Sequence, residues 1–327
     1  MKVLLKLGLF YGIIYLFIEE SYLNYPEYFP KTKYDFSKNN LSKTKIELGR
    51  MLFYDPILSI DSTISCESCH SPYNAFSHTD HRLSHGINDK IGKRNAPPLF
   101  NLAWKSSFMR DGAVNHLDMQ SLVPITDSLE MGNSLGNLLY KLKKNQKYIN
   151  MFYEAFGDST INLDRVLKSI SQFELTLISK NSKYDRFRLG EDHFSDQETR
   201  GYELFKKNCS NCHEEPMFTN YKFENNSLEI NQVLLDSGRF SITKNSNDFM
   251  SFEVPSLRNL SYTYPYMHDG RFSNLFEVLK HYSGPKFNYV SLTENEIIDI
   301  ISFLLTLNDK EFILNPENKF PVNKLLK

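Results

Sequence analysis

The pentapeptides Cys-Glu-Ser-Cys-His at residues 66–70 and Cys-Ser-Asn-Cys-His at residues 209–213 decide how this chain folds. In each one, two cysteines lie about one helical turn apart and a histidine follows directly. This spacing lets both thiols add to the vinyl groups on one edge of a haem while the histidine binds the iron. The sequence therefore predicts two covalently attached haem c groups. Their expected attachment points and iron ligands are Cys66, Cys69, His70, Cys209, Cys212 and His213.

A zinc site is the alternative that two CxxC pairs raise. The pairs are about 140 residues apart, far beyond the usual spacing in zinc sites, and each is followed by a histidine that zinc does not require. All 4 cysteines of the chain lie in the two motifs, so none remains for a disulfide framework. Two haems therefore explain the cysteines better than zinc or disulfides do.

Length and composition are those of an ordinary globular protein. The 327 residues suggest about two domains. Hydrophobic residues make up 41% and charged residues 24%, which leaves enough apolar material for a sizeable core. The net charge of -1 creates no global field that would draw the chain to nucleic acid. We therefore expect no nucleic-acid partner.

The first 20 residues have the pattern of an export signal. Lys2 and Lys6 supply positive charge, and the apolar run 7–18 suits a signal-peptide core but is short for a membrane span. No small-x-small cleavage site follows, so residues 1–20 are either a signal peptide or an N-terminal membrane anchor, with a buried core helix as a third reading. Either export route places the rest of the chain in the periplasm, where haem c attachment is expected.

The remaining chain divides into a linker and two units of similar design. Residues 21–41 are polar and aromatic and are expected to be a linker, followed by units at 42–186 and 187–327. A glycine and a phenylalanine four positions apart precede each haem motif: Gly49 and Phe53, then Gly201 and Phe205. Such a pair shares one helix face, and the glycine would let another helix approach closely. The repeat indicates two copies of one haem-binding unit.

Helical periodicity and capping signals predict a mainly α-helical fold with long loops. Apolar residues recur at helical spacing over 43–53, 161–179 and 297–307. Ser195–Glu198 and Thr293–Glu296 are capping boxes, in which a hydroxyl and a carboxylate satisfy the first free amides of a helix. Runs that alternate apolar and polar residues, as strands do, are few.

Several further motifs carry a family resemblance. The run Leu-Gly-Arg-Met-Leu-Phe-Tyr-Asp-Pro at residues 48–56, before the first haem motif, resembles the bacterial di-haem cytochrome c peroxidase and MauG family. Gly92–Pro97, Val254–Asn259 and Tyr264–Gly270 are also similar to motifs of that family. They occur in family order and cover residues 42 to 310.

The resemblance implies two cytochrome c-like domains, each with one haem, and a calcium ion between them. It implies an enzyme that reduces hydrogen peroxide to water with electrons from a small cytochrome c or a cupredoxin. The N-terminal haem would meet peroxide, and the C-terminal haem would receive the electrons. Family members are commonly dimers, so a homodimer is one possible assembly.

The resemblance also assigns roles around the first haem. Glu130 matches the family's catalytic glutamate, and Gln120 matches a second position in the same pocket. A carboxyl above an apolar haem face can move a proton from the inner to the outer peroxide oxygen, and burial should raise its pKa. A solvated surface glutamate is the alternative. His85 matches the histidine that binds the first haem of resting peroxidases, with His78 and His81 as rivals.

The sixth ligand of the second haem has more than one candidate. Tyr282 stands where family peroxidases have methionine and MauG-type proteins have tyrosine. A phenolate stabilises ferric iron, whereas a thioether raises the potential. Met267 and His281 are rival ligands, and a buried core aromatic is the structural alternative for Tyr282.

The expected calcium site and the residue between the haems complete the assignments. Asn95, with the carbonyl groups of Thr263 and Pro265, matches the family's calcium ligands, although an asparagine can also simply cap a turn. The family usually has a tryptophan between the haems, whereas this chain has Arg110 there. Its only tryptophan, Trp104, is six residues earlier. This departure argues against a close functional copy of MauG.

Three functions remain in order of preference. A di-haem cytochrome c peroxidase comes first. A MauG-like oxidase that modifies a partner protein or a small substrate comes second and is favoured by Tyr282. A di-haem electron-transfer protein without catalysis comes third, and Glu130 above an open haem face argues against it.

Overall fold

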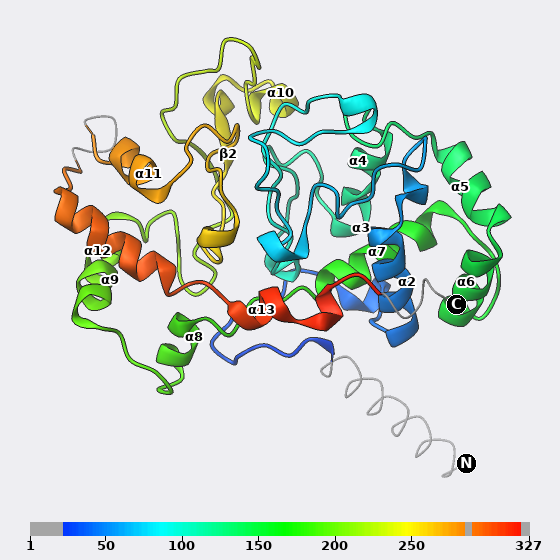
Figure 1. Ribbon diagram of the computed structural model, residues 1–327, viewed down its shortest axis with the longest axis horizontal. Helices are drawn as coiled ribbons and strands as arrows, with labels where there is room; N and C mark the ends of the chain where they lie inside the picture. The colour runs from blue at the N-terminus through cyan, green and yellow to red at the C-terminus, as the bar shows by residue number, and fades with distance from the viewer. Residues whose placement is uncertain (1–21, 285–289, 322–327) are drawn as a thin grey trace.

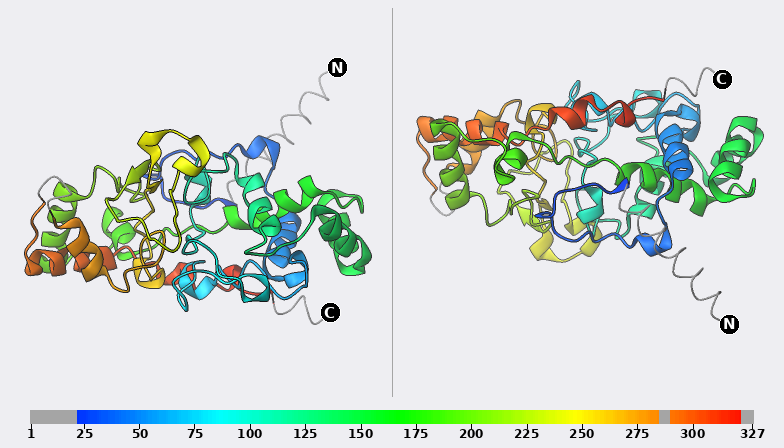
Figure 2. Two further views of the ribbon diagram at one scale, coloured as in Figure 1. Left: turned by 90° about the horizontal axis from the view of Figure 1, so that it is seen from above. Right: turned by 90° about the horizontal axis from the view of Figure 1, so that it is seen from below.

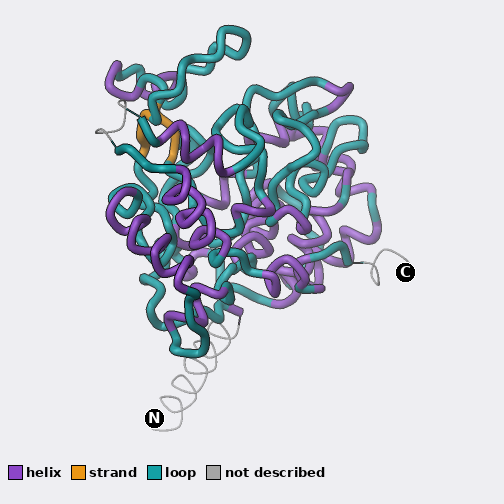
Figure 3. The backbone as a smooth tube through the Cα atoms, turned by 60° about the vertical axis from the view of Figure 1, so that its left-hand side comes forward, coloured by secondary structure: helices purple, strands orange, loops and turns teal. Residues whose placement is uncertain are grey.

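The computed structural model describes residues 22–284 and 290–321. Figure 1 shows the first half of the chain on the right and most of the second half on the left. Figure 2, from above and below, shows the two halves side by side along the long axis. Figure 3 shows helices joined by long loops, as the sequence predicts, and one small pair of strands.

The regular elements are mostly short helices. The α-helices are α2 (Lys43–Tyr54), α3 (Leu117–Gln120), α4 (Leu122–Thr126), α5 (Leu135–Lys144), α6 (Gln146–Phe156), α7 (Leu163–Leu175), α8 (Lys183–Arg188), α9 (Asp196–Asn208), α10 (Phe240–Thr243), α11 (Leu275–Tyr282), α12 (Glu294–Leu305) and α13 (Lys310–Leu314). The 3-10 helices are η1 (Phe36–Lys38), η2 (Pro56–Leu58), η3 (Pro72–Asn74), η4 (Ile87–Asp89), η5 (Leu102–Trp104), η6 (Ser246–Asp248), η7 (Leu260–Tyr262) and η8 (Pro316–Asn318). Strands β1 (Phe223–Asn225) and β2 (Ser251–Glu253) pair antiparallel.

The same helix crossing occurs in both halves. Helix α2 packs against α7, and α9 packs against α12 (Figure 1). A Cβ atom on Gly49 would lie 1.7 Å from the carbonyl oxygen of Ser169, and one on Gly201 would lie 1.9 Å from that of Asp299. Only glycine permits these approaches. The expected role of the two glycines, and the repeat built on them, are confirmed.

Both capping boxes form as the sequence predicts. Ser195 and Glu198 exchange hydrogen bonds at the start of α9, and Thr293 and Glu296 do so at the start of α12. The helix expected over 161–179 is shorter, because α7 ends at Leu175. The chain then turns, and the Leu177 carbonyl accepts the N–H of Asn101 at 2.8 Å.

The segment 22–41, expected as a linker, packs against the folded halves. Phe29 is buried, and its ring meets Trp104 edge to face at a centroid distance of 5.4 Å. The Trp104 indole N–H donates to the Pro30 carbonyl at 2.7 Å. The Tyr34 hydroxyl donates to Asp118 at 2.7 Å. This aromatic segment is therefore part of the core rather than a free connection.

The two halves are also joined at the other end of the chain. Phe312 of α13 packs against Phe76, which follows the first haem motif, at a ring-centroid distance of 5.9 Å. The Tyr54 hydroxyl donates to the Asn318 carbonyl at 2.5 Å. The last described residues of the expected unit 187–327 thus complete the core of the first unit.

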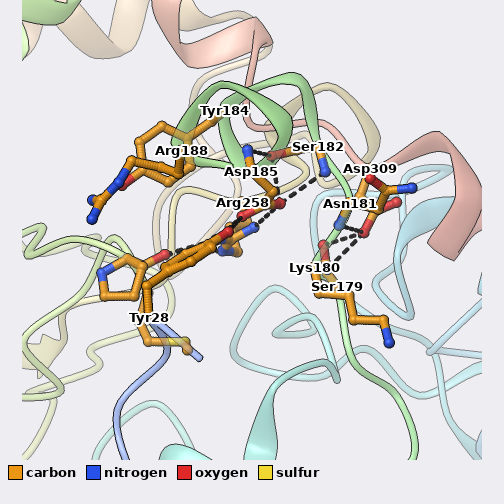
Figure 4. Close-up of polar contacts among 12 residues, drawn as sticks. Tyr28, Ser179, Lys180, Asn181, Ser182, Tyr184, Asp185, Arg188, Arg258 and Asp309 are labelled. Carbon is orange, nitrogen blue, oxygen red and sulfur yellow. Dashed lines mark hydrogen bonds and ion pairs between the residues drawn. The ribbon is translucent and has the colours of Figure 1, made fainter. Parts of the chain in front are cut away.

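A buried ion pair marks the junction of the halves (Figure 4). Arg258 donates to both carboxylate oxygens of Asp185 at 2.8 and 2.7 Å, and neither side chain is exposed to solvent. The Tyr28 hydroxyl donates to the same carboxylate at 2.6 Å. Three separate stretches of chain meet at Asp185.

Within residues 22–284 and 290–321, no helix is long and apolar enough to cross a membrane. The signal peptide or anchor expected at residues 1–20 lies outside the described residues.

Candidate functional site

Both haem motifs form the same short helical turn. In the first, the backbone N–H groups of Cys69 and His70 donate to the Cys66 carbonyl at 3.2 and 2.9 Å. In the second, Cys212 and His213 donate to the Cys209 carbonyl at the same two distances. The turn brings two cysteines and a histidine close together in each motif, as attachment of a single haem requires.

The two histidines are held in the orientation that an iron ligand needs. His70 Nδ1 lies 2.8 Å from the Phe76 carbonyl oxygen, and His213 Nδ1 lies 3.1 Å from that of Phe218. An Nδ1–H that donates to a carbonyl leaves Nε2 available for iron. Burial lowers the pKa of each histidine to about 4, so both rings are neutral at pH 7. The residues of both motifs therefore fit a haem.

A cavity lies beside the first haem motif. Its apolar wall includes Phe53, Leu99 and Met131. Six residues selected from the sequence also line it: Cys66, Cys69, His70, His85, Gln120 and Glu130. Residues from four separate stretches of sequence therefore meet around one apolar space.

Glu130 follows α4 in a tight turn. Its N–H donates to the Asp127 carbonyl at 3.1 Å, and its own carbonyl accepts the Ile87 N–H at 2.8 Å. A Cβ atom on Gly86 would lie 2.4 Å from the Glu130 carbonyl oxygen, so the loop around His85 rests directly on the glutamate segment. Burial, and then the charge of Asp127, raise the pKa of Glu130 to about 7. The carboxyl can therefore both accept and release a proton near neutral pH.

Gln120 lies at the end of α3 on the same cavity. Its side-chain amide donates to the Met109 sulfur at 3.7 Å.

Glu174 is a cavity residue that the sequence did not single out. It lies at the end of α7, is only 3% exposed, and one of its carboxyl oxygens has no hydrogen-bond partner among the described residues. Burial, and then the charge of Asp118, raise its pKa to about 8. The one signal in the sequence was an acidic residue beside the apolar stripe of a helix, at Phe173-Glu174.

His85 is the only one of three neighbouring histidines on the cavity wall in the described structure. Its Nδ1 lies 2.6 Å from a carboxylate oxygen of Asp89, which leaves Nε2 as the ligand nitrogen. The His81 ring stacks on it at 4.5 Å, and His78 Nε2 lies 3.1 Å from His81 Nδ1. The Asp89 contact was not foreseen, although a partner at i+4 is a simple sequence signal.

The rival ligands of the second haem meet around one asparagine, Asn226. Its amide donates to the Met267 sulfur at 3.6 Å, and its carbonyl oxygen lies 2.8 Å from His281 Nε2. Tyr282 ends α11 in the same place. Burial raises the pKa of Tyr282 to about 12, against a hydrogen bond with Asn226 that lowers it. The tyrosine lies close to Cys212 and Cys209 of the second haem motif.

His268 is a further residue whose surroundings suit a haem. Its ring stacks on Phe252 with a centroid distance of 3.9 Å, and its buried Nδ1 has no partner among the described residues. Buried polar atoms are rarely left unsatisfied. A haem carboxylate is the kind of group that would satisfy this nitrogen.

One of the expected calcium ligands, Asn95, lies where the two halves meet and is already engaged. Asn95 is 2% exposed, and its N–H donates to the His268 carbonyl at 2.8 Å. Arg110 donates to both oxygens of Asn95, from Nε to the carbonyl at 2.9 Å and from Nη2 to the amide oxygen at 3.1 Å. A guanidinium therefore faces the oxygens that calcium would use. As arranged, Asn95 does not fit a calcium ion.

Comparison with known proteins agrees with this geometry. Residues 43–193 match the family "Di-haem cytochrome c peroxidase", and residues 198–308 match "Cytochrome c". The MauG protein of Methylophilus methylotrophus is 32% identical over 292 residues, covering 83% of this chain and 84% of that protein. The cytochrome c551 peroxidase of Nitrosomonas europaea is 32% identical over 290 residues, covering 84% of this chain and 82% of that protein.

One solved structure is similar over nearly the whole fold. It is described as a MauG-like protein associated with microbial copper homeostasis, and it superimposes with a TM-score of 0.83 at 29% identity. The match covers 91% of this chain and 99% of that one. With two cytochrome c-type domains, two haem c sites and relatives of both names, this chain belongs to the di-haem cytochrome c peroxidase and MauG family.

Proposed function

We propose that this protein is a peroxidase that reduces hydrogen peroxide to water at its first haem, the one attached to Cys66 and Cys69. Electrons enter through the second haem, attached to Cys209 and Cys212, from a small cytochrome c or a cupredoxin. The observation that carries the proposal is Glu130, whose carboxyl has a pKa near 7 and shares a cavity with the first haem motif.

The residues around the cavity can perform the proton transfers. When bound, the haem supplies the iron that holds peroxide and the electrons that reduce it. Glu130 takes the proton from the inner peroxide oxygen and gives it to the outer oxygen, which leaves as water. Gln120 offers an amide that can orient peroxide. Two electrons and two protons convert each peroxide into two water molecules.

His85 and Tyr282 are proposed as the further iron ligands of the first and second haems. Asp89 holds His85 Nδ1, which supports ligation through Nε2. Tyr282 is supported by its place close to Cys212 and Cys209. Release of His85 would open the first haem to peroxide. Calcium is not part of the proposal, because Arg110 already occupies the Asn95 oxygens.

The protein is proposed to work in the periplasm. Haem c attachment and the apolar N-terminus support export, and the family relatives are consistent with it. A membrane anchor at residues 1–20 and a homodimer stay predictions. Gel filtration and fractionation of cells that express the full chain test them.

A MauG-like oxidase is the second candidate. Tyr282, rather than methionine, near the second haem motif favours it, as do MauG proteins among the relatives. Arg110 in place of the family tryptophan counts against it. Trp104 does not replace that residue, because its indole is buried against Phe29 and bonded to the Pro30 carbonyl. A purely electron-transferring protein would not need a buried, titratable carboxyl on an open cavity.

Peroxide turnover by the protein with both haems tests the proposal. We expect oxidation of a reduced small cytochrome c by peroxide, and a loss of roughly 10²–10⁴-fold in E130Q. The haem spectra of E130Q should be retained. The control is E154Q, an exposed carboxyl on α6, which should turn over like the parent. Turnover that is absent in both the oxidised and the half-reduced parent, or unchanged in E130Q, would contradict the proposal.

A further inference from the structure

Arg110 links the two halves of the molecule through its backbone. It lies in a loop closed by hydrogen bonds between Phe108 and Val114, at 2.7 and 3.4 Å. The carbonyl of Arg110 accepts the N–H of Glu253, at the end of β2, at 2.8 Å. The loop therefore belongs to the first half but is fixed against the second.

The Arg110 side chain is directed at a buried asparagine that also joins the halves. Asn95 donates its N–H to the His268 carbonyl at 2.8 Å and its side-chain amide to the Arg82 carbonyl at 3.2 Å. Both Asn95 oxygens accept from Arg110, at 2.9 and 3.1 Å. All four polar groups of Asn95 are thus engaged, and its two oxygens form a cradle around one cation.

No carboxylate among the described side chains balances the charge of this guanidinium. Within residues 22–284 and 290–321, no ion pair includes Arg110. The acidic neighbours have cations of their own: Glu253 pairs with Lys105 at 2.7 Å, and Asp269 with Arg271 at 2.8 Å. Burial lowers the pKa of Arg110 to about 10, so it stays protonated at neutral pH.

Neutral amide and carbonyl oxygens are also the ligands that a hard divalent cation takes. A calcium ion at the Asn95 oxygens would lie within a few ångströms of the guanidinium, where like charges repel strongly in a partly buried setting. No spare carboxylate among the described neighbours would offset that repulsion. The two Asn95 oxygens can hold only one cation, and the Arg110 guanidinium is that cation.

We propose that Arg110 is a built-in cation that replaces calcium at the boundary between the two haem domains. The protein then assembles its interface without a metal ion. Its haem spectra and potentials should not respond to removal of calcium.

The metal content of the purified protein tests this directly. Protein with both haems is passed through gel filtration in calcium-containing buffer, and calcium and iron are counted by mass spectrometry. We expect two irons and no calcium per chain, and unchanged haem spectra and reduction potentials after treatment with EGTA. One retained calcium per chain would overturn the proposal. The count needs no turnover, so it is independent of the peroxidase proposal.

Variants identify the residue responsible. R110M removes the charge and the donors but keeps most of the length, and it should gain one calcium per chain in titration calorimetry. R110K keeps the charge and should stay calcium-free. K105Q is the matched control, because it removes a neighbouring interface cation that does not contact Asn95, and it should also bind no calcium. An R110M protein with both haems and no calcium, or calcium binding by K105Q, would contradict the role of Arg110.

Discussion

The Glu130 carboxyl owes its proton affinity to two separate causes. Its burial beside the haem cavity raises its pKa first, and the negative charge of Asp127 raises it further, to about 7. Asp127 is three residues earlier, and its side chain accepts the Leu129 N–H at 2.8 Å. The second cause can therefore be removed without opening the cavity.

Turnover should fall as the pH drops below about 7, because only the ionised Glu130 can accept the peroxide proton. D127N removes the neighbouring charge but keeps an oxygen for Leu129, so it should move this acidic limb to lower pH. The measurement is the pH profile of kcat/KM for peroxide. E154Q should leave the midpoint in place. The same midpoint in D127N and the parent would mean that another group sets the limb.

Tyr282 and Met267 can be separated by spectroscopy. If Tyr282 binds the second iron, Y282F removes the phenolate and should change the ferric absorption and electron spin resonance spectra of that haem and raise its potential. M267L should leave both spectra unchanged. The opposite pair of results would assign the ligand to Met267. Both residues contact Asn226, so packing alone should suffer similarly in the two variants.

Residues whose chemistry is local in the chain were predictable, and residues that act through tertiary contacts were not. The turn from Cys66 to His70 is complete within five positions, so its spacing alone indicates a haem. Glu130 could be found only by resemblance. Glu174 reaches the cavity because of the orientation in which α7 packs against its neighbours. No short sequence motif encodes that orientation. The contact of Arg110 with Asn95 likewise depends on a loop folding back.

At the scale of elements, two glycines set how closely the paired helices approach. The Gly201 position of α9 lies against the backbone of α12, and the Gly49 position of α2 lies against α7. A methyl group at either place would meet a carbonyl oxygen that cannot move without shifting a helix. Overpacking of this kind usually costs about 1–3 kcal/mol.

G201A should therefore lower the free energy of unfolding by about 1–3 kcal/mol, followed by denaturant titration with the haem absorption as the signal. The control is G136A on α5, where a Cβ atom has no heavy atom within 4 Å. Alanine there should be neutral or stabilise by up to about 1 kcal/mol, because it is the better helix former. Equal stability of G201A and the parent would show that α9 and α12 can separate at no cost.

Helix starts were easier to predict than helix ends and connections. The capping boxes at Ser195 and Thr293 are local hydrogen-bond patterns, and both formed as expected. Helix α7 ends at Leu175, and two residues later the chain is held by Asn101, which is remote in sequence. The segment 22–41 has a linker composition, but Phe29 and Tyr34 are buried against residues that come later in the sequence.

At the scale of the molecule, the junction around Asp185 holds distant parts of the chain together (Figure 4). Arg258 comes from the second half, Tyr28 from the N-terminal segment, and Asp185 from α8 between them. A second carboxylate, Asp309, accepts the N–H groups of Lys180 and Asn181 at 2.7 and 2.9 Å. The halves should therefore unfold together rather than one after the other.

The Asp185 carboxylate also makes this junction sensitive to acid. Burial alone would raise its pKa, but Arg258 and the hydrogen bonds from Tyr28 and Ser182 outweigh burial and lower it. A group whose pKa is lower in the folded state stabilises the fold above its unfolded pKa, about 3.9. That contribution is lost as the pH falls from there through the folded pKa.

D185N should lower the free energy of unfolding at pH 7 by about 3–5 kcal/mol, because Arg258 is left as a buried charge without its partner. It should also weaken the dependence of stability on pH below about 4, since the titrating group is gone. The measurement is denaturant unfolding at several pH values. The matched control is R200Q, which removes the ion pair made by Arg200, whose side chain is 60% exposed. It should lower the free energy of unfolding by at most about 1 kcal/mol. If D185N cost no more than R200Q, the junction would not be what holds the two haem domains together, and the coupling would rest on the Arg110 and Asn95 contact instead.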